Sequence, residues 1–249
     1  MAIAASLSVS ARVVLVTGST SGIGLATAQR FSDMGDTVVF NSTHSFEAGE
    51  HLAAITANSH YVQADIARPE DCDRLLHEVM ERYGRLDVLV NNAGITKLIP
   101  HSDLEAASVD VWREIFDVNV FGTWQLSVAA MPALKTTHGN IVNVSSVAGV
   151  RATGSSIPYA ASKAALNHLT TLLAKACGPE VRVNGVAPGL IDTPWTSEWD
   201  TVRKFVSTVA PLRRTGTADD VADVIVALAT TSYVTGQIVV VDGGLSLAT

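Results

Sequence analysis

The chain has 249 residues, of which 47% are hydrophobic and 16% are charged, and its formal net charge is −7. This length and apolar content predict one folded domain, residues 1–249, and exclude a disordered chain. The acidic balance without a long basic run argues against nucleic-acid binding, and no apolar stretch is long enough to span a membrane.

The cysteines and the N-terminus bear on the compartment. Cys72 and Cys177 are far apart and follow no metal-binding spacing, so we expect neither a metal site nor a disulfide. The first ten residues lack a basic n-region, and we interpret them as a short leader to the fold rather than a signal peptide. The expected location is therefore the cytoplasm.

Apolar runs typical of buried strands alternate with helical periodicity along the chain. The predicted strands are 12–17, 37–41, 60–63, 86–91, 140–145, 181–186 and 237–241. The predicted helices are 22–34, 45–57 with Ser45 as its cap, 69–83, 108–130, 158–177 and 217–230. This alternation predicts an α/β fold, a doubly wound parallel sheet of the Rossmann type with about seven strands and helices on both faces.

Tyr159 and Lys163 lie four residues apart in the predicted helix 158–177, so their side chains share one face. Such pairs also occur by chance on helices. An ammonium beside a phenol favours the phenolate, so we expect Lys163 to lower the pKa of Tyr159 and to make it a general acid and base. Ser146 follows the strand 140–145 and could reach the same substrate oxygen, whereas the side chain of Ser145 should face the other way.

A glycine-rich turn follows the first predicted strand. Gly18, Gly22 and Gly24 lie in the run T-G-S-T-S-G-I-G, where missing Cβ atoms let the backbone approach a pyrophosphate at a helix N-terminus. The spacing is not G-x-G-x-x-G, so a purely structural turn is the alternative. Its place after the first strand of the alternating pattern favours a dinucleotide.

Three motifs together resemble the short-chain dehydrogenase/reductase family in its short single-domain form. They are T-G-x-x-x-G-I-G at 17–24, N-N-A-G at 91–94 and Y-x-A-S-K at 159–163, with further matches at 65–66, 119–122 and 188–193. The resemblance implies an NAD(P)-dependent oxidoreductase that moves a hydride between a nicotinamide and a small-molecule carbonyl or alcohol. The alternatives are a 3-oxoacyl-(acyl-carrier-protein) reductase-like enzyme and a dinucleotide-binding sensor without turnover, and the complete motif argues against the sensor.

The resemblance also implies residue roles. Tyr159 would be the acid and base, Lys163 would tune it and bind the nicotinamide ribose, and Ser146, thirteen positions before Tyr159, would hold the substrate oxygen. Asn119 would sit at a local helix distortion and hold a water that feeds protons to Lys163, while Asn91 would tie the sheet together. The implied cofactor contacts are Gly18, Ser19, Ser21, Gly22, Ile23, Gly24, Ser42, Asp65, Ile66, Asn92, Ala93, Gly94, Tyr159, Lys163, Pro188, Gly189, Ile191 and Thr193. For Asp65, a cap on the approach to the next helix is the alternative.

The sequence favours NADP over NAD as the cofactor. No acidic residue stands between Asp36 and Glu47, where NAD-binding folds place the carboxylate that accepts from the ribose 2′-OH. No Lys or Arg stands between Arg30 and Arg68, so the usual cationic clamp for a 2′-phosphate is also missing. Ser42, Thr43, His44 and the following helix N-terminus could hold the phosphate, although His44 can equally be a solvated loop residue.

Residues 191–210 are predicted to form a lid over the substrate. Trp195, Trp199 and Phe205 suggest an apolar substrate, or they pack the lid onto the body. The resemblance further implies a homotetramer, in which helices 108–130 and 158–177 pair across one two-fold axis and the strand 237–241 joins a second contact. A monomer with well-packed helices is the alternative.

Overall fold

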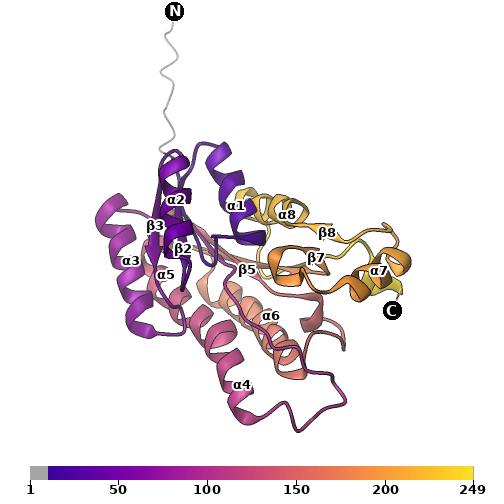
Figure 1. Ribbon diagram of the computed structural model, residues 1–249. Coiled ribbons are helices and arrows are strands. Elements are labelled where there is room, and N and C mark those ends of the chain that lie inside the picture. Colours follow the sequence, from indigo (N-terminus) through magenta and orange to yellow (C-terminus); the bar gives the residue numbers. More distant parts are fainter. Residues whose placement is uncertain (1–10, 249) are drawn as a thin grey trace, which may run out of the picture.

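Seven parallel strands form the central sheet, in the order β3-β2-β1-β4-β5-β6-β9 (Figure 1). The computed structural model describes residues 11–248, and the predicted leader lies outside them. The strands are β1 (Val13–Val16), β2 (Thr37–Ser42), β3 (Ser59–Gln63), β4 (Val88–Asn91), β5 (Asn140–Val144), β6 (Arg182–Pro188) and β9 (Ile238–Val241). The sequence prediction of a doubly wound parallel sheet is confirmed, because each of the seven predicted strands is present.

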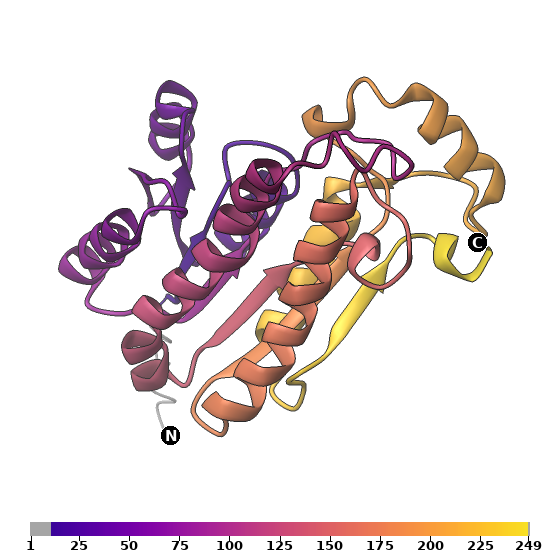
Figure 2. The same cartoon turned by 90° about the horizontal axis from the view of Figure 1, so that it is seen from below.

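Two layers of helices cover the sheet, and Figure 2 shows α5 and α6 side by side on one of its faces. Apolar side chains of α3, α5 and α6 pack in one core cluster, and those of α1, α2 and α8 pack in the other. The helices are α1 (Gly22–Asp33), α2 (Phe46–Ile55), α3 (Pro69–Tyr83), α4 (Val109–Phe116), α5 (Thr123–Thr137), α6 (Ile157–Cys177), α7 (Asp200–Val209), α8 (Ala218–Thr230) and α9 (Leu245–Ala248).

The strand order reverses between β1 and β4. β1 pairs with β2 on one side and with β4 on the other, so the chain leaves β1 in one direction and later continues from β4 in the opposite direction. In open parallel sheets, ligands bind in the crevice that this reversal opens at the carboxyl ends of the strands. The glycine-rich turn after β1 and the N-N-A-G run at the end of β4 both lie there.

The predicted helix 108–130 is interrupted and longer than expected. A π-helical segment, η1 (Asp117–Gly122), separates α4 from α5, and α5 continues through Pro132 to Thr137. A proline removes one helical hydrogen bond, yet the helix continues past Pro132. The carbonyl that lacks this bond belongs to Val128, a half-exposed residue.

The expected cap at the start of α2 is wrong. The Ser45 side chain makes no cap hydrogen bond; instead its backbone N–H donates to the Ser42 hydroxyl at 3.2 Å. Thr217 and Asp220, in contrast, form a capping box at the start of α8. Among residues 11–248, no helix is long and apolar enough to cross a membrane.

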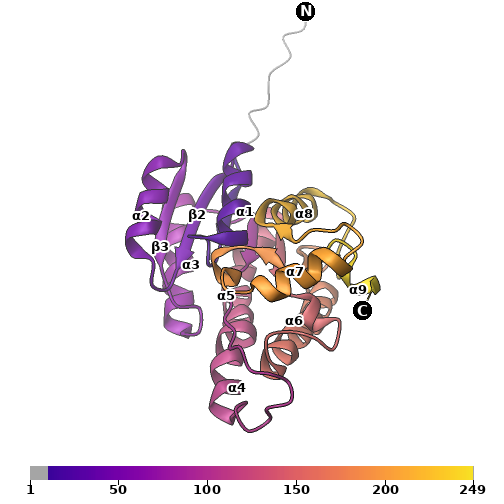
Figure 3. The same ribbon diagram turned by 45° about the vertical axis from the view of Figure 1, so that its right-hand side comes forward.

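A small second sheet lies between β6 and α8 and was not predicted. β7 (Ile191–Asp192) pairs in parallel with β8 (Gly216–Thr217), and between them lie a short 3-10 helix, η3 (Pro194–Thr196), and α7. Figure 3 shows α7, in orange, beside α9 and the C-terminus, away from the strands β2 and β3. Two-residue strands leave no hydropathy pattern in the sequence, which explains why they were missed.

Candidate active site

A cleft of about 950 Å³ opens at the carboxyl edge of the sheet. Its walls come from the turn after β1, the ends of β2 to β6, the start of α6 and the 191–210 segment. Chain segments that are far apart in the sequence therefore meet at the crevice that the strand order predicts. The cleft is large enough for a dinucleotide together with part of a second ligand.

The glycines of the turn after β1 shape the floor of the cleft. Gly18 has φ +60°, and a Cβ there would lie 3.0 Å from the Ala93 Cα. At Gly24, a Cβ would lie 2.4 Å from the Gly18 carbonyl oxygen, so this position needs glycine for helix packing. Asn92 Nδ2 donates to the carbonyls of Thr17 and Gly18, at 2.8 and 3.0 Å, and ties the end of β4 to the turn.

Most of the predicted cofactor contacts line the cleft. Those that do are Gly18, Ser21, Gly22, Ile23, Ser42, Asp65, Ile66, Asn92, Ala93, Gly94, Tyr159, Lys163, Pro188, Gly189, Ile191 and Thr193. Ser19 and Gly24 are not among the lining residues. Ser19 is buried, and its hydroxyl accepts the Asn41 backbone N–H at 2.9 Å, so the side chain serves the packing of β2 against the turn.

Ser146, Tyr159 and Lys163 meet on one wall of the cleft. The Ser146 hydroxyl accepts the Ala148 N–H at 3.1 Å, and its side chain acts to lower the pKa of the Tyr159 phenol. The Ser145 hydroxyl donates to the Lys163 carbonyl of α6 at 3.2 Å, and Ser145 also lines the cleft. Of the two serines, Ser146 is the one that acts on the Tyr159 phenol.

The charge state of this wall differs from the expectation. Lys163 is 4% exposed, and burial lowers its pKa to about 8. Desolvation raises the pKa of Tyr159, and only the hydrogen bond from Ser146 acts in the lowering direction. The predicted lowering by Lys163 is wrong for this structure, because the Lys163 ammonium donates to the Val144 carbonyl at 2.9 Å and lies 5.8 Å from the centre of the tyrosine ring.

Asn119 lies in the π-helical segment η1, so the predicted helix distortion is confirmed. Its side-chain amide donates to the Ile95 carbonyl and the Ser162 hydroxyl, both at 3.0 Å, and its oxygen accepts the Ile95 N–H at 2.8 Å. Asn119 is fully buried and does not line the cleft. A Cβ on Gly94 would lie 3.1 Å from the Asn119 oxygen and 3.4 Å from the Lys163 ammonium, so a bare backbone separates the two groups.

Asn91 and Asp65 have structural partners. Asn91 Nδ2 donates to the Asn143 side-chain oxygen at 2.9 Å and thereby ties β4 to β5, as predicted. Asp65 accepts the Ala67 N–H at 3.0 Å, in the loop before α3, and it also lines the cleft; the N-cap of α3 is Arg68. The Ser42 hydroxyl is already engaged with the Tyr61 hydroxyl at 2.9 Å.

Arg203 anchors the 191–210 segment. Its guanidinium donates to Asp192 at 2.8 Å, to Asp200 at 2.6 Å and to the Thr196 carbonyl at 2.6 Å, and so joins β7, α7 and η3. From this segment, Trp195, Trp199 and Val202 are among the residues that line the cleft, whereas Phe205 is not and is half exposed.

Comparison with known proteins places this architecture in a family. A family model described as enoyl-(acyl carrier protein) reductase matches residues 18–246. A protein of Streptomyces violaceoruber, named as ketoacyl reductase 2 of the granaticin polyketide synthase, is 53% identical over 241 residues, which are 95% of this chain and 97% of the relative. The chain belongs to the short-chain dehydrogenase/reductase family.

Other members extend the comparison. The 3-oxoacyl-[acyl-carrier-protein] reductase FabG of Thermotoga maritima is 37% identical over 242 residues, 94% of this chain and 97% of the relative. The solved structure of ElxO with NADP bound has a TM-score of 0.87 at 29% identity and covers 95% of this chain and 99% of that one. This short-chain dehydrogenase/reductase is therefore an oxidoreductase that acts on hydroxyl or keto groups with a nicotinamide cofactor.

The residues present fit such a cofactor. Gly18 and Gly22 have φ +60° and +55°, which favour glycine, and they line the same cleft as Tyr159 and Lys163. The sequence analysis missed other lining residues, notably Glu114, Thr153 and Ser155. The last two precede Tyr159 by four to six positions, so their proximity to it was the only available signal.

Proposed function

We propose that this short-chain dehydrogenase/reductase reduces the keto group of a ketoacyl chain held as a thioester, with NADPH as the hydride source. The observation that carries the proposal is that Ser146, Tyr159 and the buried Lys163 line one cleft together with the glycine-rich turn after β1. The ketoacyl substrate is supported by the names of the relatives from Streptomyces violaceoruber and Thermotoga maritima.

In the proposed mechanism, Tyr159 donates its phenolic proton to the substrate oxygen as negative charge develops there. When bound, the reduced nicotinamide supplies the hydride to the carbonyl carbon. The Ser146 hydroxyl donates a second hydrogen bond to the same oxygen, which is preorganised stabilisation of the developing charge. A phenol with an ordinary pKa of about 10 is already protonated at neutral pH, and desolvation raises the pKa of Tyr159 further, so Tyr159 is the acid that reduction requires.

Lys163 and Asn119 complete the proposed machinery. Lys163 would hold the nicotinamide ribose and place a positive charge near the phenolate that forms at Tyr159. Only the backbone of Gly94, which has no side chain, lies between Asn119 and the Lys163 ammonium. We propose that a water held by Asn119 returns the proton along this line.

We propose NADP(H) as the preferred cofactor. Thr43 and His44 line the cleft after β2, and no carboxylate there would repel a 2′-phosphate. The preference should be modest, because no guanidinium lines this end of the cleft. NADP in the related ElxO structure supports the same choice.

We propose that residues 191–210 act as the substrate lid of a single-domain protein. Trp195 and Trp199 give it an apolar inner surface that would cover an acyl chain. Arg203 ties α7 to β7 through an ion pair with the exposed Asp192 carboxylate, a bond weak enough to open while the main sheet stays fixed.

We further propose a homotetramer in the cytoplasm. Trp124 and Val128 on α5 and Leu172 on α6 are half exposed and would be covered if these helices pair across a two-fold axis. β9 is an edge strand and would join the second contact. Light scattering after size exclusion tests the assembly, and a mass near 26.1 kDa would contradict it.

Cys72 and Cys177 are both free thiols, which supports the proposed reducing compartment. Cell fractionation can check this location.

The direct test of the function is turnover of a substrate panel. Ketoacyl thioesters, sugars, steroids and small alcohols are assayed by nicotinamide absorbance with NADPH, NADH and the oxidised cofactors. We expect reduction of the ketoacyl thioesters to dominate. Turnover of another class alone would replace the substrate, and binding without any turnover would favour a sensor.

A further inference from the structure

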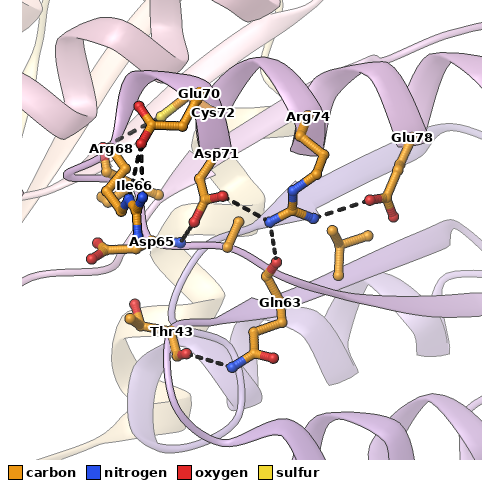
Figure 4. A network of polar contacts seen from close by, with 12 residues as sticks. Thr43, Gln63, Asp65, Ile66, Arg68, Glu70, Asp71, Cys72, Arg74 and Glu78 are labelled. Carbon is orange, nitrogen blue, oxygen red and sulfur yellow. Dashed lines mark hydrogen bonds and ion pairs between the residues drawn. The ribbon is translucent and has the colours of Figure 1, made fainter.

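A network of polar contacts lies behind the end of the cleft that Thr43 and Asp65 line (Figure 4). Thr43 follows β2 and Asp65 follows β3, and both line the cleft. Gln63, the last residue of β3, and Arg74 on α3 do not. Gln63 nevertheless contacts the Thr43 backbone directly, and Arg74 reaches the Asp65 backbone through Asp71.

One arm of the network fixes Thr43. The Gln63 side-chain amide donates to the Thr43 carbonyl at 2.8 Å, and the Gln63 carbonyl accepts from Arg74 at 2.7 Å. Arg74 is held in turn by Asp71 at 3.0 Å and by Glu78 at 3.1 Å, both on α3. The loop after β2 is therefore tied through Gln63 to a helix on the body of the molecule.

The other arm fixes Asp65. The second Asp71 carboxylate oxygen accepts the Asp65 backbone N–H at 2.9 Å. This bond, followed by the bond from Arg74, holds the pKa of Asp71 below its usual value. Arg74 thus joins the arm to Thr43 with the arm to Asp65.

The position of the Thr43 backbone matters because this end of the cleft has no cationic clamp. A phosphate bound there would rely on N–H and hydroxyl groups, whose strength depends on distance and angle. The Ser42 hydroxyl is already bonded to Tyr61. Thr43 and His44 therefore remain as the donors to the phosphate. The position of these donors depends on the position of the loop that carries them.

Resting on the proposed NADP preference, we propose that Gln63 and Arg74 are positioning residues that set the discrimination between cofactors with and without a 2′-phosphate. Gln63 acts only on the phosphate side through Thr43, whereas Arg74 acts on both sides. Neither residue needs to touch the cofactor. The inference therefore predicts different effects for the two arms.

The test measures binding of 2′,5′-ADP and 5′-AMP to the purified full chain by calorimetry. Gln63→Met keeps the length of the side chain and removes its donor to Thr43. We expect the affinity for 2′,5′-ADP to fall roughly three- to tenfold, with 5′-AMP within about twofold of the wild type. Arg74→Gln should weaken both ligands, and Arg74→Lys should recover part of the loss.

Arg68→Gln is the matched control, because Arg68 is an exposed arginine close by whose side chain pairs with Glu70. It should leave both affinities unchanged. Equal losses for the two ligands in Gln63→Met, or no loss, would overturn the inference. A wild type that binds 5′-AMP as tightly as 2′,5′-ADP would instead contradict the proposed NADP preference.

Discussion

The wall that carries Ser146, Tyr159 and Lys163 and the proposed lid, residues 191–210, hold their polar groups in opposite ways. On the wall, Lys163 is 4% exposed and Asn119 is fully buried, and each bonds to backbone carbonyls. On the lid, Arg203 binds Asp192 and Asp200, whose side chains are 45% and 80% exposed. Buried hydrogen bonds fix geometry, whereas exposed ion pairs are weak and easily exchanged. A fixed wall suits proton transfer, and a loosely held lid suits entry and release of substrate.

The largest effect should come from the acid on the fixed wall. Tyr159→Phe keeps the ring and removes only the proton, so we expect kcat to fall roughly 100- to 10,000-fold. Affinity for NADPH, measured by fluorescence titration, should stay close to that of the wild type. Activity within a few-fold of the wild type would remove Tyr159 from the proposed role.

The two adjacent serines provide the next test of the wall. Ser146→Ala removes a donor to the substrate oxygen and should lower kcat about 100-fold or more. Ser145→Ala loses only a neutral bond to the Lys163 carbonyl, which is worth about 1 kcal/mol of stability, and should leave kcat within a few-fold. Steady-state kinetics and thermal melts separate the two, and similar kcat losses would contradict the assignment.

A smaller effect is expected on the lid. Arg203→Ala frees α7 from β7 and η3, so KM for the ketone should rise roughly three- to tenfold while kcat changes less. Lys204→Ala is the control, because Lys204 is an exposed cation on the same helix. A fall in kcat with unchanged KM would show that the lid acts on the chemical step instead.

The smallest expected effect concerns pH and the buried lysine. The pKa of Lys163 is about 8 in the folded chain and near 10.5 when unfolded, so between these values the unfolded chain holds the extra proton. The free energy of unfolding contributed by this group therefore increases as pH rises from about 8 to 10.5. Urea unfolding of the cofactor-free protein should show this rise relative to Lys163→Met. Parallel pH profiles would contradict the lowered pKa.

The sequence predicted what depends on local pattern. The seven strands follow from apolar runs, and the glycine-rich turn, Asn91 and Ser146 follow from motifs whose spacing is set by one turn or one strand end. The preference for Ser146 over Ser145 came from the alternation of side chains along a strand.

The rest depends on contacts between distant segments. A lowered pKa of Tyr159 was predicted from its spacing to Lys163. The Lys163 ammonium instead donates to the carbonyl of Val144, nineteen positions before it, and burial raises the pKa of Tyr159. Ser19 and Gly24 share the motif yet face the packing side of the turn. The hydrogen bond from Gln63 to Thr43 joins residues twenty positions apart, and no periodic pattern in the sequence predicts it.

The pairing of β7 with β8 has an evolutionary consequence. Ile191 aligns with Gly216 and Asp192 with Thr217, so the residues between these strands leave the body and return to it at one place. Insertions with adjoining ends are tolerated because their replacement leaves the parent backbone undisturbed. We therefore propose that residues 194–214 vary between relatives as one unit, so that a family of enzymes diversifies its substrates while the residues for hydride transfer, which lie outside this segment, are inherited unchanged.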